Sequence, residues 1–119
     1  MSIATTEAVL RRFNNVFLSH DPSVLEGLVG EECVIENTQP APNGSRHVGR
    51  AACIELWRGI ATAPGTWFVP EDLIVLGDRG IILWRFCWGE AEEQSVPGVN
   101  LMRVVDDRIV EALGYVKGN

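Results

Sequence analysis

Apolar residues recur at helical spacing in the first part of the chain. They form one stripe made of Val9, Leu10, Phe13, Val16 and Phe17. This period predicts an amphipathic helix, and Thr5 is its expected N-cap because a threonine hydroxyl accepts a hydrogen bond from the first turn. Asp21 followed by Pro22 is typical of a new helix start. A short second helix is therefore predicted, with Val24, Leu25, Leu28 and Val29 as its buried face and Gly30 as its end.

The pattern then changes to a period of two. Cys33–Thr38 predicts a strand on which Cys33, Ile35 and Asn37 share one face. Residues Gln39–Arg46 are dense in Pro, Asn, Gly and Ser, which predicts a loop. Arg50–Gly59 predicts a third helix, whose apolar positions are Ala52, Cys53, Leu56 and Trp57.

The second half of the chain has the pattern of antiparallel strands. Leu73–Leu76 and Ile81–Trp88 flank the turn sequence Gly-Asp-Arg-Gly, and Val99–Val105 and Arg108–Val116 flank Asp-Asp. Helices followed by a meander of strands are typical of the α+β class. We expect one domain over residues 1–119, with about three N-terminal helices on one face of a curved antiparallel or mixed sheet.

The predicted strand Ile81–Trp88 is apolar on both faces apart from Arg85. A strand of this kind is covered on both sides, whereas the helices can cover only one side of the sheet. The other side is then expected to pack against a second subunit. The sequence therefore predicts a homodimer formed through the sheet face.

Composition and charge exclude several function classes. The net charge is −6 and no basic stripe is present, so a nucleic-acid partner is not expected. No apolar run reaches the roughly 18 residues of a membrane span, and the N-terminus has no signal-peptide pattern, so the expected location is cytoplasmic. The cysteines Cys33, Cys53 and Cys87 are expected as buried free thiols. No CxxC or HxxxH spacing occurs, so neither a metal nor another cofactor is expected.

Several segments carry a family resemblance. They are Gly30–Asn37, Gly44–Gly49, Arg50–Ala52, Leu56-Trp57 and the closing segment Asn100–Gly114, NLMRVVDDRIVEALG. In these segments the chain resembles the SnoaL-like proteins of the nuclear transport factor 2-like superfamily, which includes ketosteroid isomerases and limonene epoxide hydrolases. The resemblance implies a cone-shaped, cystatin-like α+β barrel around an apolar pocket. It implies no single function, because one fold hosts many activities.

The resemblance to ketosteroid isomerases places three roles on this chain. Their catalytic base falls on Asn37, which is a poor proton acceptor near neutral pH. Their carbonyl-polarising tyrosine falls on Phe13, which has no donor, and their protonated acid falls on Asn100, which can still donate a hydrogen bond. Isomerisation by the usual mechanism is therefore not expected.

The resemblance to epoxide hydrolases fits at one position only. Asn37 matches the asparagine that helps to hold the attacking water in those enzymes. Their arginine falls on Arg85, but its acidic partners fall near Cys87 and Gly114, so the catalytic triad is absent.

The remaining polar candidates have alternative interpretations. Arg85 either anchors a ligand anion or forms an ion pair with Glu36 or Glu111, or it lies at the dimer interface. Asn37 and Asn100 either converge on one ligand oxygen or form hydrogen bonds with each other or with nearby backbone groups. His47 is either an acid–base group at the pocket mouth or a solvated loop residue.

Aromatic residues and one thiol are the candidate ligand contacts. The predicted ligand-binding set is Phe13, Trp57, Trp84 and Cys87, with Trp88 as a further aromatic candidate. The alternative for each of them is plain core packing.

Two function hypotheses follow. In the first, the protein is an isomerase, cyclase or hydrolase that acts on a small cyclic metabolite, apolar or weakly anionic, with Asn37, Asn100 and Arg85 polarising oxygen. His47 or the substrate itself would then move the proton. In the second, it is a non-catalytic dimeric binding module.

Overall fold

The computed structural model describes residues 3–118. It contains the helices α1 (Ile3–Ser19), α2 (Leu25–Leu28) and α3 (Arg50–Thr62), with single 3-10 turns η1 (Pro22–Val24) and η2 (Glu92–Gln94). The strands are β1 (Val29–Asn37), β2 (Ser45–Val48), β3 (Trp67–Leu76), β4 (Arg79–Cys87), β5 (Ser95–Val105) and β6 (Arg108–Val116).

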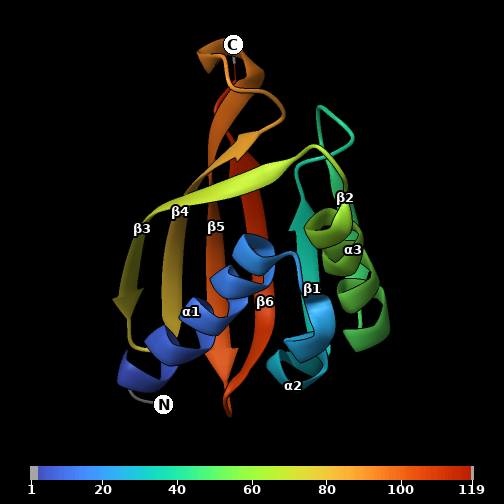
Figure 1. Cartoon of the computed structure of the whole chain (residues 1–119). Coiled ribbons are helices and arrows are strands. Elements are labelled where there is room, and N and C mark those ends of the chain that lie inside the picture. Colours follow the sequence, from blue (N-terminus) through green and yellow to red (C-terminus); the bar gives the residue numbers. More distant parts are fainter. Residues whose placement is uncertain (1–2, 119) are drawn as a thin grey trace.

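The strands form one six-stranded mixed sheet in the order β2-β1-β6-β5-β4-β3. The β1–β6 pair is parallel and the other neighbouring pairs are antiparallel. Figure 1 shows a strongly curved sheet with α1 lying across one of its faces and α3 beside β1 and β2. The predicted α+β class with helices on one face of a curved mixed sheet is confirmed.

Two strands begin earlier than predicted. β3 begins at Trp67 rather than Leu73, and β5 begins at Ser95 rather than Val99. A proline near the start of each strand, Pro70 in β3 and Pro97 in β5, interrupts the strand pattern in the sequence. Pro70 is tolerated because β3 is an edge strand that pairs only with β4, so its missing N–H leaves no gap inside the sheet. A register shift next to Pro70 marks a β-bulge.

Local signals at the helix ends were partly correct. Asp21 caps η1, since its carboxylate accepts from the Ser23 backbone N–H at 3.0 Å. Thr5 lies inside α1 and is not its N-cap, which corrects the prediction. Val24 lies in η1, before α2 begins, and is 42% exposed rather than buried. Gly30 does not end the second helix but lies inside β1, because the chain passes directly from α2 into β1.

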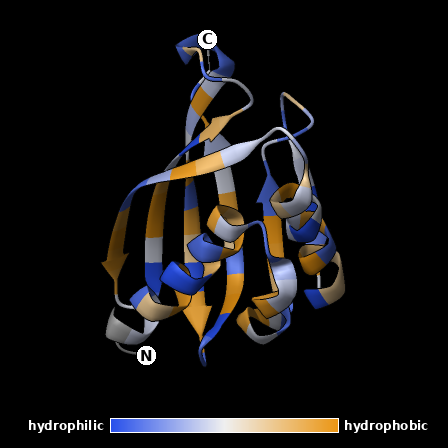
Figure 2. Ribbon diagram, viewed as in Figure 1, coloured by the Kyte–Doolittle hydropathy of each residue, from blue (hydrophilic) through white to orange (hydrophobic). Residues whose placement is uncertain are grey.

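The core lies between the helices and the concave face of the sheet. Its fully buried side chains include Leu10 of α1, Leu25 and Leu28 of α2, and Met102 of β5. Figure 2 shows the alternation of hydrophobic and polar residues along the strands. On β1, Cys33 and Ile35 are buried and share the face of Asn37, as predicted.

The three cysteines are free and buried, as predicted. Burial raises the pKa of the Cys33 thiol and that of the Cys53 thiol, because the charged thiolate loses its hydration. Among the described residues, no helix has the length and apolarity that a membrane crossing requires.

The face of the sheet opposite the helices carries many apolar side chains. Trp67 and Ile74 of β3 and Tyr115 of β6 are exposed there, by 36%, 49% and 55%. Ile81 and Leu83 of β4 lie between them in the register and are half-buried. This outer face is defined here by Trp67, Val69, Ile74, Ile81, Leu83, Val99 and Tyr115.

Candidate functional site

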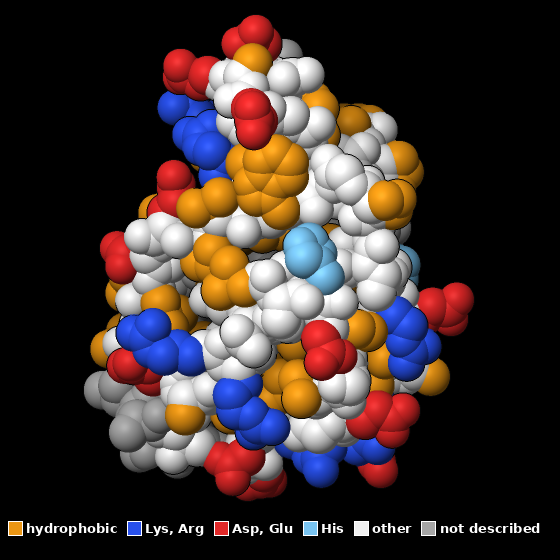
Figure 3. Space-filling view, viewed as in Figure 1, with side chains coloured by type: hydrophobic (Ala, Val, Ile, Leu, Met, Phe, Trp, Pro, Cys, Tyr) orange, Lys and Arg blue, Asp and Glu red, His pale blue; other side chains and the backbone are white. Residues whose placement is uncertain are grey.

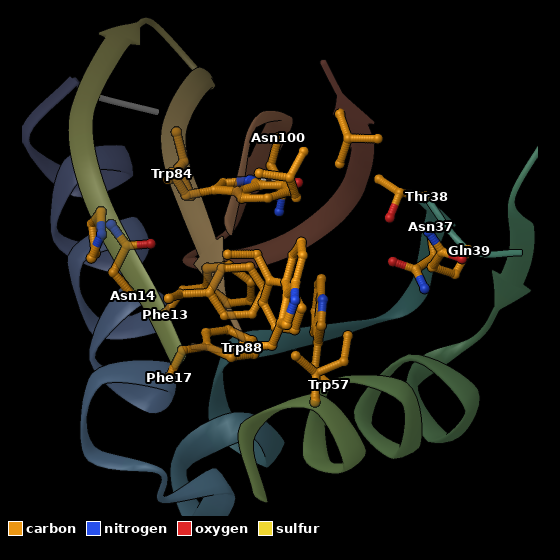
Figure 4. A pocket seen from close by; sticks show the side chains of 17 residues that line it. Phe13, Asn14, Phe17, Asn37, Thr38, Gln39, Trp57, Trp84, Trp88 and Asn100 are labelled. Atoms are coloured by element: carbon orange, nitrogen blue, oxygen red, sulfur yellow. Dashed lines mark hydrogen bonds between the residues drawn. The ribbon is translucent and has the colours of Figure 1, made fainter. Parts of the chain in front are cut away.

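A cavity of about 450 Å³ lies between α1, α3 and the concave side of the sheet. Seven of its 17 lining residues are aromatic: Phe13, Phe17, Trp57, Phe68, Trp84, Phe86 and Trp88. The polar lining side chains are Asn14, Asn37, Thr38, Gln39 and Asn100 (Figure 4). A concave, mostly apolar site of this size with a few polar groups is typical of small-molecule pockets.

The residue periods of helices and strands explain why these side chains point into the cavity. Phe13 and Phe17 are one helical turn apart on α1, and Trp57 projects from α3 on the other side of the cavity. Ile82, Trp84 and Phe86 alternate along β4, so all three point to the concave side.

The aromatic rings brace one another edge to face. The ring centroids of Phe13 and Trp57 are 4.7 Å apart with an interplanar angle of 68°. Phe17 meets Phe68 at 5.6 Å, and Phe68 meets Trp84 at 5.2 Å and 83°. This geometry is favourable because a ring edge is positive and a ring face negative. The wall is therefore held in place from several elements.

Among the described lining residues, Trp84 and Asn100 are the only two whose side chains form a hydrogen bond with each other. The Trp84 Nε1–H donates to Asn100 Oδ1 at 3.2 Å. An indole N–H can only donate, so the Asn100 atom next to it must be the oxygen, which settles the orientation of the amide. The Asn100 Nδ2 group donates no hydrogen bond to any of residues 3–118. Since no fully buried side-chain nitrogen of the described chain lacks a partner, this group keeps some accessible surface.

Asn37 lies at the last position of β1, where the strand runs into Thr38 and Gln39. These three residues form the polar side of the cavity in Figure 4. The Asn37 amide has no hydrogen-bond partner within the described chain, and it does not pair with Asn100. The two amides thus remain available to a ligand.

Arg85 does not line the cavity. It is the odd-numbered neighbour of Trp84 and Phe86, so it points to the outer face of the sheet. There its Nε lies 3.7 Å from the Glu71 carboxylate, and its Nη1 donates to Ser95 Oγ at 2.9 Å. Neither expected partner is used, since Glu36 pairs with Arg46 and Glu111 pairs with Arg79. The placement contradicts a role for Arg85 as an anion anchor in this cavity.

Two further candidates also lie outside the cavity lining. His47 is on the edge strand β2, and its Nε2 lies 2.9 Å from Ser45 Oγ. Cys87 is buried but shares the strand face of Arg85 rather than that of Trp84. The predicted pocket positions of both residues are therefore wrong.

Five of the predicted site residues line the cavity, namely Phe13, Asn37, Trp57, Trp84 and Asn100, and so does the further aromatic candidate Trp88. Their roles toward a ligand stay predictions. Sequence reasoning missed Phe17 and Phe86, although the helical spacing from Phe13 and the alternation from Trp84 both point to them. It also missed Asn14 and Phe68, for which the sequence held no signal.

The described lining residues include no acid, histidine, cysteine, lysine, arginine or tyrosine. Near neutral pH, therefore, none of them can take up or release a proton. Nor do the described residues hold a cluster of three or more His, Cys, Asp or Glu suited to a metal ion.

Two acidic residues lie next to one part of the cavity lining. Glu92 and Glu93 lie in η2, and η2 is tied to the lining residue Trp88 by a 2.9 Å hydrogen bond from Trp88 N to Gln94 O. Figure 3 shows acidic side chains at the tip of the molecule with hydrophobic side chains below them. This charge disfavours an anionic ligand.

Comparison with known proteins adds family and fold. The family model described as the SnoaL-like domain matches residues 10–112. The crystal structure of an NTF2-like protein of unknown function from Mesorhizobium loti has 59% sequence identity and a TM-score of 0.90, over 98% of this chain and 93% of the other. No curated protein matches the sequence.

More distant structures share the fold alone. A protein of unknown function with a cystatin-like fold from Methylobium petroleophilum PM1 is 16% identical with a TM-score of 0.80, over 100% of this chain and 80% of the other. A steroid delta-isomerase from Pseudomonas aeruginosa is 18% identical with a TM-score of 0.77, over 97% of this chain and 81% of the other.

Proposed function

The chain belongs to the SnoaL-like domain family, and we propose that it binds a neutral, flat, largely apolar ring compound in the cavity between α1, α3 and the sheet. The proposal rests on one observation: aromatic rings and amides line the described cavity, and no titratable side chain does. Such a lining offers stacking surface and hydrogen bonds but no means of proton transfer. Of the two function hypotheses, binding without acid–base chemistry is therefore favoured.

A comparison of charged and neutral ligands tests this proposal. A neutral ring ketone such as 1-tetralone is expected to bind and to raise the Tm, whereas 1-naphthoate, with a similar ring and a carboxylate, is expected to bind much more weakly. The reason is that a carboxylate loses its hydration in the cavity, and no cation among the described lining residues compensates for that loss. Calorimetric titration of both compounds measures the difference, and tighter binding of the carboxylate contradicts the proposal.

A catalytic function is the second candidate, and the unpaired Asn100 Nδ2 donor favours it. A fixed amide donor beside a ligand carbonyl stabilises an enolate oxygen. The substrate would then have to move its own proton, because the described wall supplies no base. Incubation with a cyclic β,γ-unsaturated ketone, followed by absorbance of the conjugated product, tests this function. A rate equal to that in buffer excludes it for this substrate class.

The assembly we propose is a homodimer through the outer face. Exposed Trp67, Ile74 and Tyr115 support it, together with the half-buried Ile81 and Leu83 that lie between them, because a large apolar patch on one face usually marks an interaction site. The Arg85–Glu71 pair on the same face would lie at or near such an interface. The ligand cavity opens on the opposite side of the sheet, so the dimer and the ligand would not compete.

A further inference from the structure

Trp57 carries a hydrogen-bond donor that the protein itself does not use. The residue is only 4% exposed, and it lies in the core between α3 and α1. The indole Nε1–H can donate but cannot accept. Within residues 3–118 no oxygen or nitrogen accepts a hydrogen bond from it.

This donor is nevertheless not sealed inside the core. No fully buried side-chain nitrogen or oxygen in the described chain lacks a hydrogen-bond partner, so the unpaired Trp57 Nε1 must retain some accessible surface. Trp57 lines the cavity and projects toward it from α3 in Figure 4. Its small remaining exposure thus belongs to the cavity wall, and the N–H is available there.

The ring cannot easily turn the N–H elsewhere. Phe13 packs against it edge to face at 4.7 Å, and both rings belong to the buried core cluster. A ligand that covers Trp57 with hydrocarbon would remove its N–H from water without replacing the lost hydrogen bond, which is unfavourable. A ligand with an oxygen acceptor at that point avoids this cost.

We propose that the cavity recognises ring compounds with two oxygen acceptors, one for Asn100 Nδ2 on β5 and one for Trp57 Nε1 on α3. The two donors come from opposite walls, the sheet and the helix layer. The acceptors must therefore lie at separate positions of the ring skeleton, as in a cyclic ketone with a second carbonyl or ring-ether oxygen. This inference rests on the proposed function and specifies its ligand class.

Compounds of one shape and different acceptor number test the inference. Tetralin has no acceptor and 1-tetralone has one, whereas 4-chromanone and isochroman-4-one carry a ring oxygen in place of a CH2 group at two different positions. At least one of the two ring-oxygen compounds is expected to bind the wild-type protein about three- to tenfold more tightly than 1-tetralone, the gain of one good hydrogen bond. Calorimetric titration gives each Kd.

Trp57→Phe removes the donor and keeps an aromatic ring. In this variant the gain from the ring oxygen is expected to disappear, while any general loss of affinity falls equally on 1-tetralone. Trp88→Phe is the matched control, since Trp88 also lines the cavity but is 46% exposed. In Trp88→Phe the ring-oxygen compound is expected to keep its higher affinity over 1-tetralone. No gain in the wild type, or a gain that survives Trp57→Phe, overturns the inference.

A spectroscopic readout does not depend on affinity. The indole N–H proton of Trp57, assigned by its loss in Trp57→Phe, is expected to shift further downfield with the best ring-oxygen compound than with tetralin. Equal shifts with both compounds contradict the inference. Absence of binding by all four compounds rejects the proposed function together with the inference, whereas binding that ignores the ring oxygen rejects the inference alone.

Discussion

Trp84 and Asn100 are linked across the neighbouring strands β4 and β5 by a 3.2 Å hydrogen bond from the indole Nε1–H to the amide oxygen. This bond joins the aromatic wall of the cavity to its polar group. It also leaves the amide Nδ2 of Asn100 as a donor to the cavity. Both residues were singled out from the sequence, but their hydrogen bond was not.

Replacement of Asn100 by leucine tests this arrangement. Asn100→Leu removes the acceptor of the Trp84 N–H and the donor to the ligand, so we expect a loss of stability of about 1–2 kcal/mol. Affinity for 1-tetralone should fall about five- to tenfold, with little change for tetralin. Urea unfolding and calorimetric titration measure the two effects. An equal loss of affinity for both compounds would show that the variant only disturbs the wall.

The Trp84 indole lies so close to the backbone of residue 98 that only a glycine fits at this position. A Cβ at this position would overlap the Trp84 indole and would lie 2.6 Å from the backbone oxygen of Tyr115. Gly98→Ala should therefore destabilise the protein by about 1–3 kcal/mol and weaken ligand binding, because the Trp84 ring must move. The matched control is Gly27→Ala in α2, where a Cβ meets no atom within 4 Å. Comparable unfolding curves for the two variants would contradict this account.

The buried thiols should make stability depend on alkaline pH. The pKa of Cys33 and that of Cys53 are raised by burial from an ordinary value of 9.0, so both groups stay protonated in the folded chain. In the unfolded chain they ionise near 9.0, so unfolding then releases protons and stability falls as pH rises above that value. Below it, the two states bind the same protons and the effect vanishes.

A variant isolates this contribution. Between pH 8 and pH 10, Cys33→Ala should lose less stability per pH unit than the wild type, whatever its stability at pH 7. Urea unfolding across this range gives both slopes. Parallel slopes would show that Cys33 does not contribute.

Ligand affinity, in contrast, should be independent of pH. Since no acid, base or thiol lines the described cavity, the Kd of 1-tetralone should change less than about twofold between pH 6 and pH 8.5. Calorimetric titration at several pH values measures it. A larger change of the Kd over this pH range would mean that an ionisable group outside the lining residues contacts the ligand.

The proposed dimer predicts a mass of twice the chain in solution. Ile74→Lys places a charge on the outer face, where Ile74 is 49% exposed, and should shift the protein toward the monomer. Leu18→Lys is the control, because Leu18 is similarly exposed, by 54%, but lies on α1. Light scattering during size-exclusion chromatography measures both masses. A monomeric wild-type protein would exclude the dimer at that concentration.

Local patterns predicted the elements well where one period dominated. The stripe of Phe13, the alternation through Cys33 and Ile35, and the Asp106-Asp107 turn all appear in the structure, with positive φ angles of 52° and 63° at the two aspartates. Predictions failed where two signals competed. The predicted strand Leu73–Leu76 left out the part of β3 around Pro70, although an edge strand tolerates a proline, and Val24, predicted on a buried helix face, lies in η1.

The sequence by itself determined the α+β fold, because hydrophobic period, helix stops and hairpin turns are local properties of the chain. It also placed Phe13, Trp57 and Asn100 among the candidate site residues. Only the tertiary structure decided which way each strand residue points and what it meets. Arg85 and Trp84 are adjacent in sequence but lie on opposite faces of one sheet, and the Trp84–Asn100 bond joins residues whose contact depends on the pairing of β4 with β5. The same packing leaves the Trp57 N–H at the cavity wall, since burial and partners arise only when distant elements come together.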